Sequence, residues 1–395
     1  MLVIQGIISI AGLYLSFYVI YNLSLILIHF LVPKSTPTQT TPATAFKILV
    51  PAHNEELLIG RILRSIRNQD YPKELYDVLV VADNCTDQTA KIAESDDVRT
   101  LERNDSRFAG KGYAIKYGLE YLKNESYDAV FIIDADSIVA ETVLRELDRE
   151  IQRGARIMQC YNGLANPDDS WFTRLMDVSR TLGNEVLEPA KEIIGLSSHL
   201  MGNGMCFVRD VIDGYGWDAF TVGEDWEYYA KLVMKGERIA FVNKARVYHR
   251  ESADLEQATS QRLRWSSGRF AIAAKYGIQL FLNGIKSGSI MKMDAAMPLL
   301  LPNPSLGISL TLLMFMLCLV VTFPGDEGIV PAWFGLLIIL QLAFFLIGVM
   351  YVKNKKKKLT ALLFAPVFLI WKSGLDLLSV AGIGRKFWVR TERKL

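Results

Sequence analysis

The sequence is poor in the residues that build metal clusters, disulfide frameworks and basic nucleic-acid surfaces. Its 395 residues include four cysteines and four histidines. The cysteines have neither metal-ligand spacing nor a disulfide pattern, which suits a reducing compartment. Lysine and arginine number 44 against 42 aspartate and glutamate residues, so the formal net charge is only +2. Charge therefore gives no reason to expect a nucleic-acid partner.

Hydrophobic residues, by contrast, make up 51% of the chain and concentrate at its two ends. Residues 2–32 are apolar almost without interruption, which exceeds the roughly 20 residues needed to cross a ~30 Å hydrocarbon core. A cleaved signal peptide would be shorter and would begin with basic residues. We therefore predict a retained transmembrane helix over residues 1–32, followed by a linker rich in threonine and proline over residues 33–45.

The C-terminal part repeats the membrane signal. Leu306–Phe323 and Ala332–Val352 predict a helical hairpin, and residues 276–305 before it predict an interfacial segment. A third apolar stretch, residues 359–383, could cross the bilayer or lie at its surface, because Lys372 and Asp376 interrupt it. The lysine-rich run at residues 353–358 and the basic tail at 384–395 favour the cytoplasmic side. We therefore expect a multi-pass integral protein of the plasma membrane, with its central domain in the cytoplasm.

The central domain, residues 46–275, alternates apolar strands with amphipathic helices. Strands are predicted at 46–51, 76–82 and 129–133, and helices at 55–67, 86–94 and 112–122. Such alternation predicts an α/β domain with a mostly parallel sheet covered by helices on both faces. Ligands of these sheets bind beyond the carboxyl ends of the strands, where Asp83 and Asp134 stand.

Several acids follow the predicted strands. Asp134 and Asp136 supply hard oxygen ligands for Mg²⁺ or Mn²⁺, which would neutralise a departing nucleoside diphosphate. A solvated acidic turn is the structural alternative. Asp83 could accept a hydrogen bond from a uracil N–H or a ribose hydroxyl, or it could cap the next helix. Glu55 could line the same nucleotide pocket.

One lysine and two further acids add chemistry that a transfer reaction needs. Lys111, between two glycines at the start of a helix, could contact a diphosphate, although an ordinary helix-start lysine fits nearly as well. Asp225, with Glu224 before it, opens another predicted helix, whose N-terminus would keep a carboxylate ionised. An ionised carboxylate can accept the proton of an acceptor hydroxyl. Helix capping is the alternative for this pair.

The segment Gln261-Arg262-Leu263-Arg264-Trp265 puts three of its side chains on one helical face, at i, i+3 and i+4. Trp265 offers a stacking surface for a sugar, and Arg264 can clamp a diphosphate; Gln261 completes the face. An amphipathic interfacial helix would show the same pattern. His249 could complete a metal shell, although a lone histidine is more often structural.

Taken together, these residues resemble family 2 glycosyltransferases, specifically the membrane-embedded branch that includes cellulose, chitin-oligosaccharide and hyaluronan synthases. The motifs cover about residues 46–275, and the membrane segments extend the resemblance to nearly the whole chain. It implies a Rossmann-like GT-A fold and inverting transfer. By this resemblance Asp83 would contact the uridine, Lys111 would lie near the diphosphate, and Asp134 and Asp136 would form the D-x-D metal motif. Asp225 would act as the base. The acceptor and diphosphate would be bound by Gln261, Arg264 and Trp265, and the floor of the acceptor site would be formed by Gly202, Asn203 and Gly204. One departure is Ala82, which replaces the first aspartate of a usual pair.

The resulting prediction is a metal-dependent enzyme that transfers sugar from a UDP-sugar to a growing β-linked polysaccharide or oligosaccharide at the cytoplasmic face of the bilayer. Two alternatives stay open: a single-step glycolipid synthase similar to ceramide glucosyltransferase, with a lipid acceptor, and a non-catalytic subunit that binds sugar nucleotide. Three or four helices are few for walling a polar tunnel through lipid. A polymer-secreting enzyme would therefore need to form a homo-oligomer or recruit an accessory membrane subunit.

Overall fold

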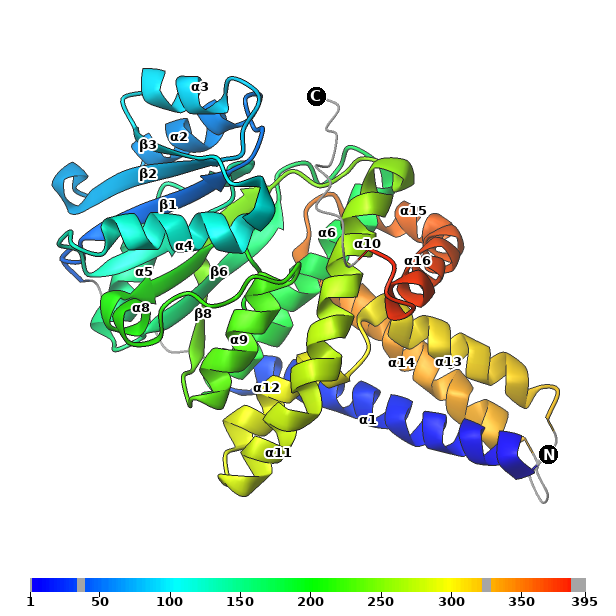
Figure 1. The fold of residues 1–395 in the computed structure, drawn as a ribbon. Coiled ribbons are helices and arrows are strands. Elements are labelled where there is room, and N and C mark those ends of the chain that lie inside the picture. Colours follow the sequence, from blue (N-terminus) through cyan, green and yellow to red (C-terminus); the bar gives the residue numbers. More distant parts are fainter. Residues whose placement is uncertain (1, 34–39, 322–327, 385–395) are drawn as a thin grey trace.

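The computed structural model describes residues 2–33, 40–321 and 328–384; the predicted basic tail from residue 385 onward lies outside them. Its centre is an eight-stranded mixed sheet with the order β3-β2-β1-β4-β7-β6-β8-β5 (Figure 1). The strands are β1 (Phe46–Ala52), β2 (Tyr76–Asp83), β3 (Arg99–Arg103), β4 (Ala129–Ile132), β5 (Ser137–Val139), β6 (Ile157–Leu164), β7 (Met205–Val208) and β8 (Ile239–His249).

The first half of the sheet is parallel, as predicted. β1 pairs in parallel with both β2 and β4, and β2 pairs in parallel with β3. β6 and β8 are also parallel, whereas β4–β7, β6–β7 and β5–β8 are antiparallel. All four residues of β4 are buried, as expected of a strand covered on both faces. The prediction of a mostly parallel α/β sheet is therefore confirmed.

Helices cover both faces of this sheet, because successive strand residues point to opposite sides. Ile48 and Val50 of β1 pack in one hydrophobic cluster with α2, α3 and α5, whereas Leu49 packs in another with α4 and α9. The helices are α1 (Leu2–Leu31), α2 (Ile59–Arg67), α3 (Thr89–Ser95), α4 (Lys111–Leu122), α5 (Val143–Gln152), α6 (Trp171–Leu182), α7 (Glu188–Ile193), α8 (Arg209–Tyr215), α9 (Glu224–Met234), α10 (Leu255–Ile272), α11 (Ile278–Lys286), α12 (Ile290–Leu300), α13 (Pro304–Cys318), α14 (Ile329–Tyr351), α15 (Lys355–Ala361) and α16 (Ala365–Val380). Short 3-10 or π segments occur at Lys73–Leu75, Ser106–Phe108, Gly183–Leu187, Ala273–Gly277 and Leu362–Phe364.

Two helices begin a few residues later than the sequence predicts. Residues 55–58 form a turn in place of the first turn of α2, because the backbone N–H of Glu55 donates to Thr89 Oγ1 (2.7 Å) and that of Glu56 donates to Asp87 Oδ2 (3.1 Å). The same Asp87 accepts the backbone N–H of Thr89 at the start of α3 (3.0 Å). A tertiary contact between two loops, which local periodicity does not record, fixes both helix starts.

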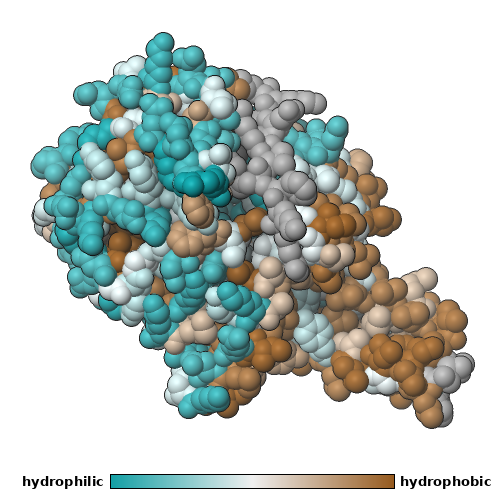
Figure 2. Space-filling model, viewed as in Figure 1, coloured by the Kyte–Doolittle hydropathy of each residue, from teal (hydrophilic) through white to brown (hydrophobic). Residues whose placement is uncertain are grey.

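Three helices in the described residues are long and apolar enough to cross a membrane: Leu2–Leu31, Ile329–Tyr351 and Lys355–Val380. The helix predicted over Leu306–Phe323 is instead α13, which ends at Cys318 and forms a pair with α12 bent by 67°. Pro302 lies between the two helices, and Pro304 is the first residue of α13, where a missing backbone donor is tolerated. Apolar surface gathers over α1, α13 and α14, whereas the sheet domain is covered by polar residues (Figure 2).

Buried charges connect the sheet domain to these apolar helices. Lys191 of α7 lies 3.1 Å from Asp294 of α12, which accepts the hydroxyl of Tyr21 in α1 (2.7 Å). Lys358, the last residue of the lysine-rich run, is 1% exposed and pairs with Asp168 (3.0 Å) and Asp177 (2.8 Å). Lys358 therefore stabilises the packing of α15 against α6 and against the loop before α6.

The junction between α14 and α6 also depends on a missing side chain. A Cβ at Gly348 would lie 2.8 Å from the carbonyl oxygen of Val178, whereas a Cβ at Gly335 on the same helix would lie 3.8 Å from its nearest neighbour, a ring carbon of Phe315. We expect Gly348→Ala to destabilise the protein by about 1–3 kcal/mol, because two backbones must separate. Gly335→Ala is the matched control and should preserve the unfolding midpoint. Thermal unfolding of the purified protein in detergent measures both, and equal midpoints would contradict the close approach.

Candidate active site

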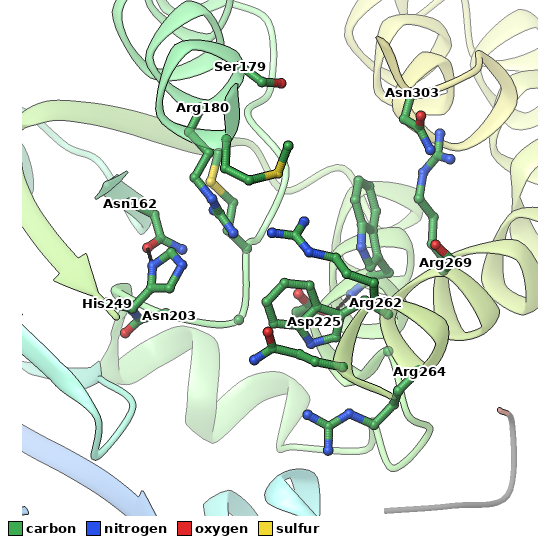
Figure 3. Close-up of a pocket in the computed structure, with 18 of the residues that line it drawn as sticks. Asn162, Ser179, Arg180, Asn203, Asp225, His249, Arg262, Arg264, Arg269 and Asn303 are labelled. Carbon is green, nitrogen blue, oxygen red and sulfur yellow. Dashed lines mark hydrogen bonds between the residues drawn. The ribbon is translucent and has the colours of Figure 1, made fainter. Parts of the chain in front are cut away.

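A single cavity of about 800 Å³ begins at the carboxyl ends of the strands and continues between the apolar helices. Asp83, Asp134 and Asp225 line its sheet end. Leu342 of α14 and Leu369 of α16 line its other end. Figure 3 shows part of this cavity, with arginine side chains directed into it from α6 and α10. The strand-end acids and the membrane helices therefore share one space.

Asp83, at the end of β2, is 2% exposed and forms an ion pair with Arg103. Arg103 Nη1 lies 2.5 Å from Asp83 Oδ1 because the two residues are parallel partners at the ends of β2 and β3. His53 Nδ1 lies 2.7 Å from the carbonyl oxygen of Asp83, and Glu55 lines the same end of the cavity. Arg103 was not predicted, because its only signal in the sequence is its place at the end of a short third strand.

Asp134 and Asp136 follow β4 in a turn, and both line the cavity. Asn203 holds this turn, since its Oδ1 accepts the backbone N–H of Asp134 (3.1 Å) and its Nδ2 donates to Ser137 Oγ (2.9 Å). Gly202 on one side of Asn203 has a φ of +78°, in the left-handed region that favours glycine. Asn203, which the sequence predicts in the floor of the acceptor site, therefore also positions the turn that carries Asp134 and Asp136.

Lys111 lies at the centre of the predicted residues. Its ammonium pairs with Asp134, donates to the carbonyl oxygen of Gly202, and lies 3.9 Å from Glu224 Oε1. Burial opposes the charge of Lys111, but Asp134 and Glu224 outweigh burial and raise its pKa. The first residue of α4 thus joins three segments that are distant in the sequence.

Glu224 and Asp225 form the first turn of α9 beside this lysine. Burial raises the pKa of Asp225, and burial together with the neighbouring Asp225 raises the pKa of Glu224. Asp225 Oδ1 accepts the backbone N–H of Trp226 (2.8 Å), and its Oδ2 faces Gly202, where a Cβ would lie only 3.1 Å away. The arrangement places a partly buried carboxylate with a raised pKa at the wall of the cavity.

Helix α10 brings Gln261, Arg264 and Trp265 to the same cavity. Its Gly268 touches the backbone before α9, since a Cβ at Gly268 would lie 3.0 Å from the nitrogen of Gly223. Gln261 Oε1 is buried and has no hydrogen-bond partner among the described residues, and Trp265 is 37% exposed. A close backbone contact therefore holds the Gln-Arg-Trp face beside Asp225.

Arg180 and Arg262 also line this cavity, and neither was predicted as a site residue. Arg262 pairs with Glu251, and Arg180 Nη2 lies 3.8 Å from the same carboxylate. Burial opposes ionisation of Glu251, but Arg262 outweighs it and holds the carboxyl pKa below its usual range. No local signal singles out Arg180, because it stands inside an amphipathic helix far from every motif.

His249 ends β8 opposite Ser137 of β5, which places it next to Asp136. Its Nδ1 lies 3.0 Å from Asn162 Oδ1 (dashed in Figure 3). Its Nε2 is buried, has no hydrogen-bond partner in the part of the chain that the structure describes, and lies 4.0 Å from Glu251 Oε2. Burial lowers the pKa of His249, which favours the neutral imidazole that binds metals.

Within the described residues, no three histidine, cysteine, aspartate or glutamate side chains converge as a complete metal-binding set. Mg²⁺ sites often use one or two protein ligands and complete their shell with substrate phosphates and water. The orphaned Nε2 of His249 beside Asp136 fits such a partial set. The carboxylate of Asp134 pairs with the ammonium group of Lys111, which already neutralises its charge.

The chain is similar in sequence to known glycosyltransferases. The sequence model of the family described as "Glycosyltransferase like family 2" matches residues 42–268. Over 240 residues the chain is 25% identical to a beta-monoglucosyldiacylglycerol synthase of Synechocystis, covering 58% of this chain and 49% of that protein. Over 255 residues it is 28% identical to an N-acetylglucosaminyltransferase of Rhizobium meliloti, covering 59% of this chain and 58% of that protein. The matches thus span about half the length of these relatives.

The fold has a solved counterpart across nearly the whole chain. A mannosyltransferase from Pyrobaculum calidifontis, solved in complex with GDP-Man and Mn²⁺, superposes with a TM-score of 0.57 over 94% of this chain and 99% of that one, at 18% sequence identity. At this identity the similarity concerns the fold alone, and it includes the GT-A sheet. Because the family model covers more than half of the 395 residues and the strand-end acids lie in one cavity, the protein belongs to glycosyltransferase-like family 2.

Proposed function

We propose that the protein is a metal-dependent, inverting glycosyltransferase that moves a sugar from a UDP-sugar to a hydroxyl group of a membrane lipid. The observation that carries this proposal is the continuous cavity, which joins the strand-end acids to the space between α13, α14 and α16. The name of the relatives from Synechocystis and Nostoc, beta-monoglucosyldiacylglycerol synthase, supports a glycolipid product.

The donor would bind at the carboxyl ends of the strands. Asp83 and Glu55 would contact the nucleoside, and Lys111 and Arg264 would contact the diphosphate. A divalent cation, Mg²⁺ or Mn²⁺, held by Asp136 and His249 would neutralise charge on the departing diphosphate. Asp134 would orient Lys111, with which it pairs.

The acceptor would approach from the membrane side. Asp225 would take the proton of the acceptor hydroxyl as that oxygen bonds to the anomeric carbon, and UDP would leave with the electrons of the broken bond. Gln261 and Trp265 would hold the transferred sugar against the floor formed by Gly202, Asn203 and Gly204. Burial of Asp225 supports this role, since it raises the affinity of the carboxylate for a proton.

A growing polysaccharide, the leading prediction from the sequence, receives less support than the glycolipid alternative. A polymer crossing a bilayer needs a polar path. The cavity between the helices has Gln341 and Lys372 in its lining, but Leu342, Phe345 and Leu369 give it the apolar surface that a lipid chain requires. We therefore favour a lipid acceptor. A location in the plasma membrane with the sheet domain in the cytoplasm remains our proposal from the lysine-rich run, and so does self-association.

The role of Asp225 gives a first prediction. Asp225→Asn should lower sugar transfer by about 10²–10⁴-fold, because a general base contributes that much, while binding of the UDP-sugar persists. Asp218→Asn is the matched control, since Asp218 has a largely exposed side chain and pairs with Lys231; it should retain activity. Transfer of labelled sugar and equilibrium binding of the donor measure the two effects. Full turnover by Asp225→Asn would rule out this base.

The partial metal set gives a second prediction. Chelation by EDTA should abolish transfer and Mn²⁺ should restore it, and His249→Gln should raise the Mn²⁺ concentration for half-maximal activity by about 10-fold or more, since one ligand is lost. His29→Gln serves as control because His29 bonds to the Tyr351 hydroxyl in the membrane helices (2.9 Å). An unchanged Mn²⁺ requirement in His249→Gln would contradict metal binding by His249.

The buried acids give a third prediction. A base must be ionised to act, so activity is present above the folded-state pKa of Asp225 and is lost as the pH falls through it. Because burial raises this pKa above the ordinary value of 3.8, the acid limb of kcat/KM should lie above pH 3.8. Glu224→Gln should move that limb to lower pH by removing a neighbouring negative charge.

Glu120→Gln, on the exposed side of α4, is the control and should leave the limb in place. The pH dependence of kcat/KM in the three proteins checks the assignment. An acid limb that stays fixed in Glu224→Gln would mean that these two acids do not titrate together.

A further inference from the structure

The membrane half of the cavity contains more positive charge, on partly buried side chains, than the carboxylates paired with it can balance. Arg180, Arg262, Arg269 and Lys372 line it. Glu251 serves both Arg180 and Arg262, and Asp376 pairs with Lys372. Two carboxylates thus serve four partly buried cations. Withdrawing a cation from water without a full counter-charge costs free energy, so these side chains favour an anion in the cavity.

Arg180 and Arg269 carry the least compensated charges. Arg180 lies no closer than 3.8 Å to Glu251, and burial lowers its pKa to about 10. Arg269 donates to the carbonyl oxygens of Pro298 and Leu301, both at 2.7 Å, and burial lowers its pKa as well. Arg180 thus shares its one ion pair with Arg262, and within the described residues Arg269 forms no ion pair. Arg180 points into the cavity in Figure 3.

The diphosphate of the donor does not account for this charge, because the donor end of the cavity has its own cations. Arg262 and Arg264 are two residues apart on α10, and at 3.6 residues per turn they leave the helix in nearly opposite directions. Figure 3 shows Arg262 directed toward Arg180, and Arg264 directed away from both. The cavity thus has two separate cationic ends.

Apolar walls begin directly beyond Arg180 and Arg262. The Arg262 guanidinium lies 5.9 Å from the ring of Phe172, which belongs to a hydrophobic cluster shared by α6, α14 and α16. Met176 of α6, Phe345 of α14 and Phe368 of α16 line the adjoining cavity. A cationic site bordered by apolar helices is complementary to a molecule with an anionic head and a hydrocarbon tail.

We propose that the acceptor is a phosphate-bearing lipid, whose phosphate lies against Arg180 and Arg262 and whose chain lies between α13, α14 and α16. This inference rests on the proposed transfer to a lipid and names the class of that lipid. The hydroxyl that accepts the sugar stands on the head group beyond the phosphate. It loses its proton to Asp225, its oxygen bonds to the anomeric carbon, and UDP departs with the electron pair of the broken bond.

The charge of the product tests this proposal on the wild-type protein. The full chain, purified in detergent, is supplied with Mn²⁺, a panel of labelled UDP-sugars and the total lipid extract of its host membrane. The labelled lipid is expected to bind an anion-exchange resin. A neutral labelled lipid, or label found only in a water-soluble polymer, would overturn the inference.

Release of UDP distinguishes failure of the lipid acceptor from failure of the proposed function. UDP release without any labelled lipid overturns the lipid acceptor but leaves donor use intact. Absence of UDP release with every donor overturns the proposed function together with the inference.

A defined pair of acceptors isolates the phosphate. Dioleoylphosphatidylglycerol and dioleoylglycerol have the same chains and both carry a free hydroxyl, but only the first has a phosphate. Where the first is turned over, Arg180→Gln should raise its KM by about tenfold or more, since a charged hydrogen bond is lost, with a smaller change for dioleoylglycerol. Arg180→Lys should recover part of the affinity.

Arg145→Gln replaces a surface arginine that pairs with Asp70 and provides the control, with no change expected in either KM. An equal effect of Arg180→Gln on both lipids would show that Arg180 acts on packing and would contradict phosphate binding. If neither defined lipid is turned over, retention of each lipid by the purified protein gives the same comparison, and equal retention counts against the proposal.

Discussion

The ammonium group of Lys111 is the contact on which the arrangement of the site depends. It joins the turn after β4, the loop at Gly202 and the first turn of α9, through Asp134, the Gly202 carbonyl and Glu224. None of these segments is adjacent in sequence, and each carries a different part of the site. A buried lysine is stable there only because carboxylates surround it. These carboxylates keep Lys111 protonated, and the resulting ammonium is a suitable partner for the negative charge of a diphosphate.

Small residues set the second constraint, which is the distance between the sheet domain and the helices around it. Gly223 and Gly268 let α9 and α10 meet backbone to backbone, and Gly348 does the same for α14 against α6. These contacts bring the predicted base to the Gln-Arg-Trp face and bring the apolar helices to the edge of the same cavity. The continuity between donor site and membrane helices therefore follows from close backbone packing.

The parts of the fold that could be predicted are those in which a local pattern and burial agree. β1, β2 and β4 are apolar runs that become buried parallel strands, and the acids that follow β2 and β4 come together because parallel strands end at one edge. Predictions failed where a distant segment intervened. The turn at residues 55–58 replaces a helical turn because the loop after β2 captures its backbone donors. Helix α13 ends at Cys318, before the predicted end at Phe323. Arg103 and Arg180 were not predicted, because each depends on a carboxylate partner in another part of the chain, Asp83 for Arg103 and Glu251 for Arg180.

The sequence by itself determined the order of the acidic motifs, the α/β alternation and the apolar ends, since all three are local properties of composition and periodicity. Only the tertiary structure decided how these parts combine. It packs α10 against the start of α9, continues the donor cavity between α13, α14 and α16, and gathers Arg180, Arg262 and Arg269 with too few carboxylates. The physical reason is that electrostatic balance and cavity shape depend on distances between residues far apart in the chain, and a linear sequence does not contain those distances.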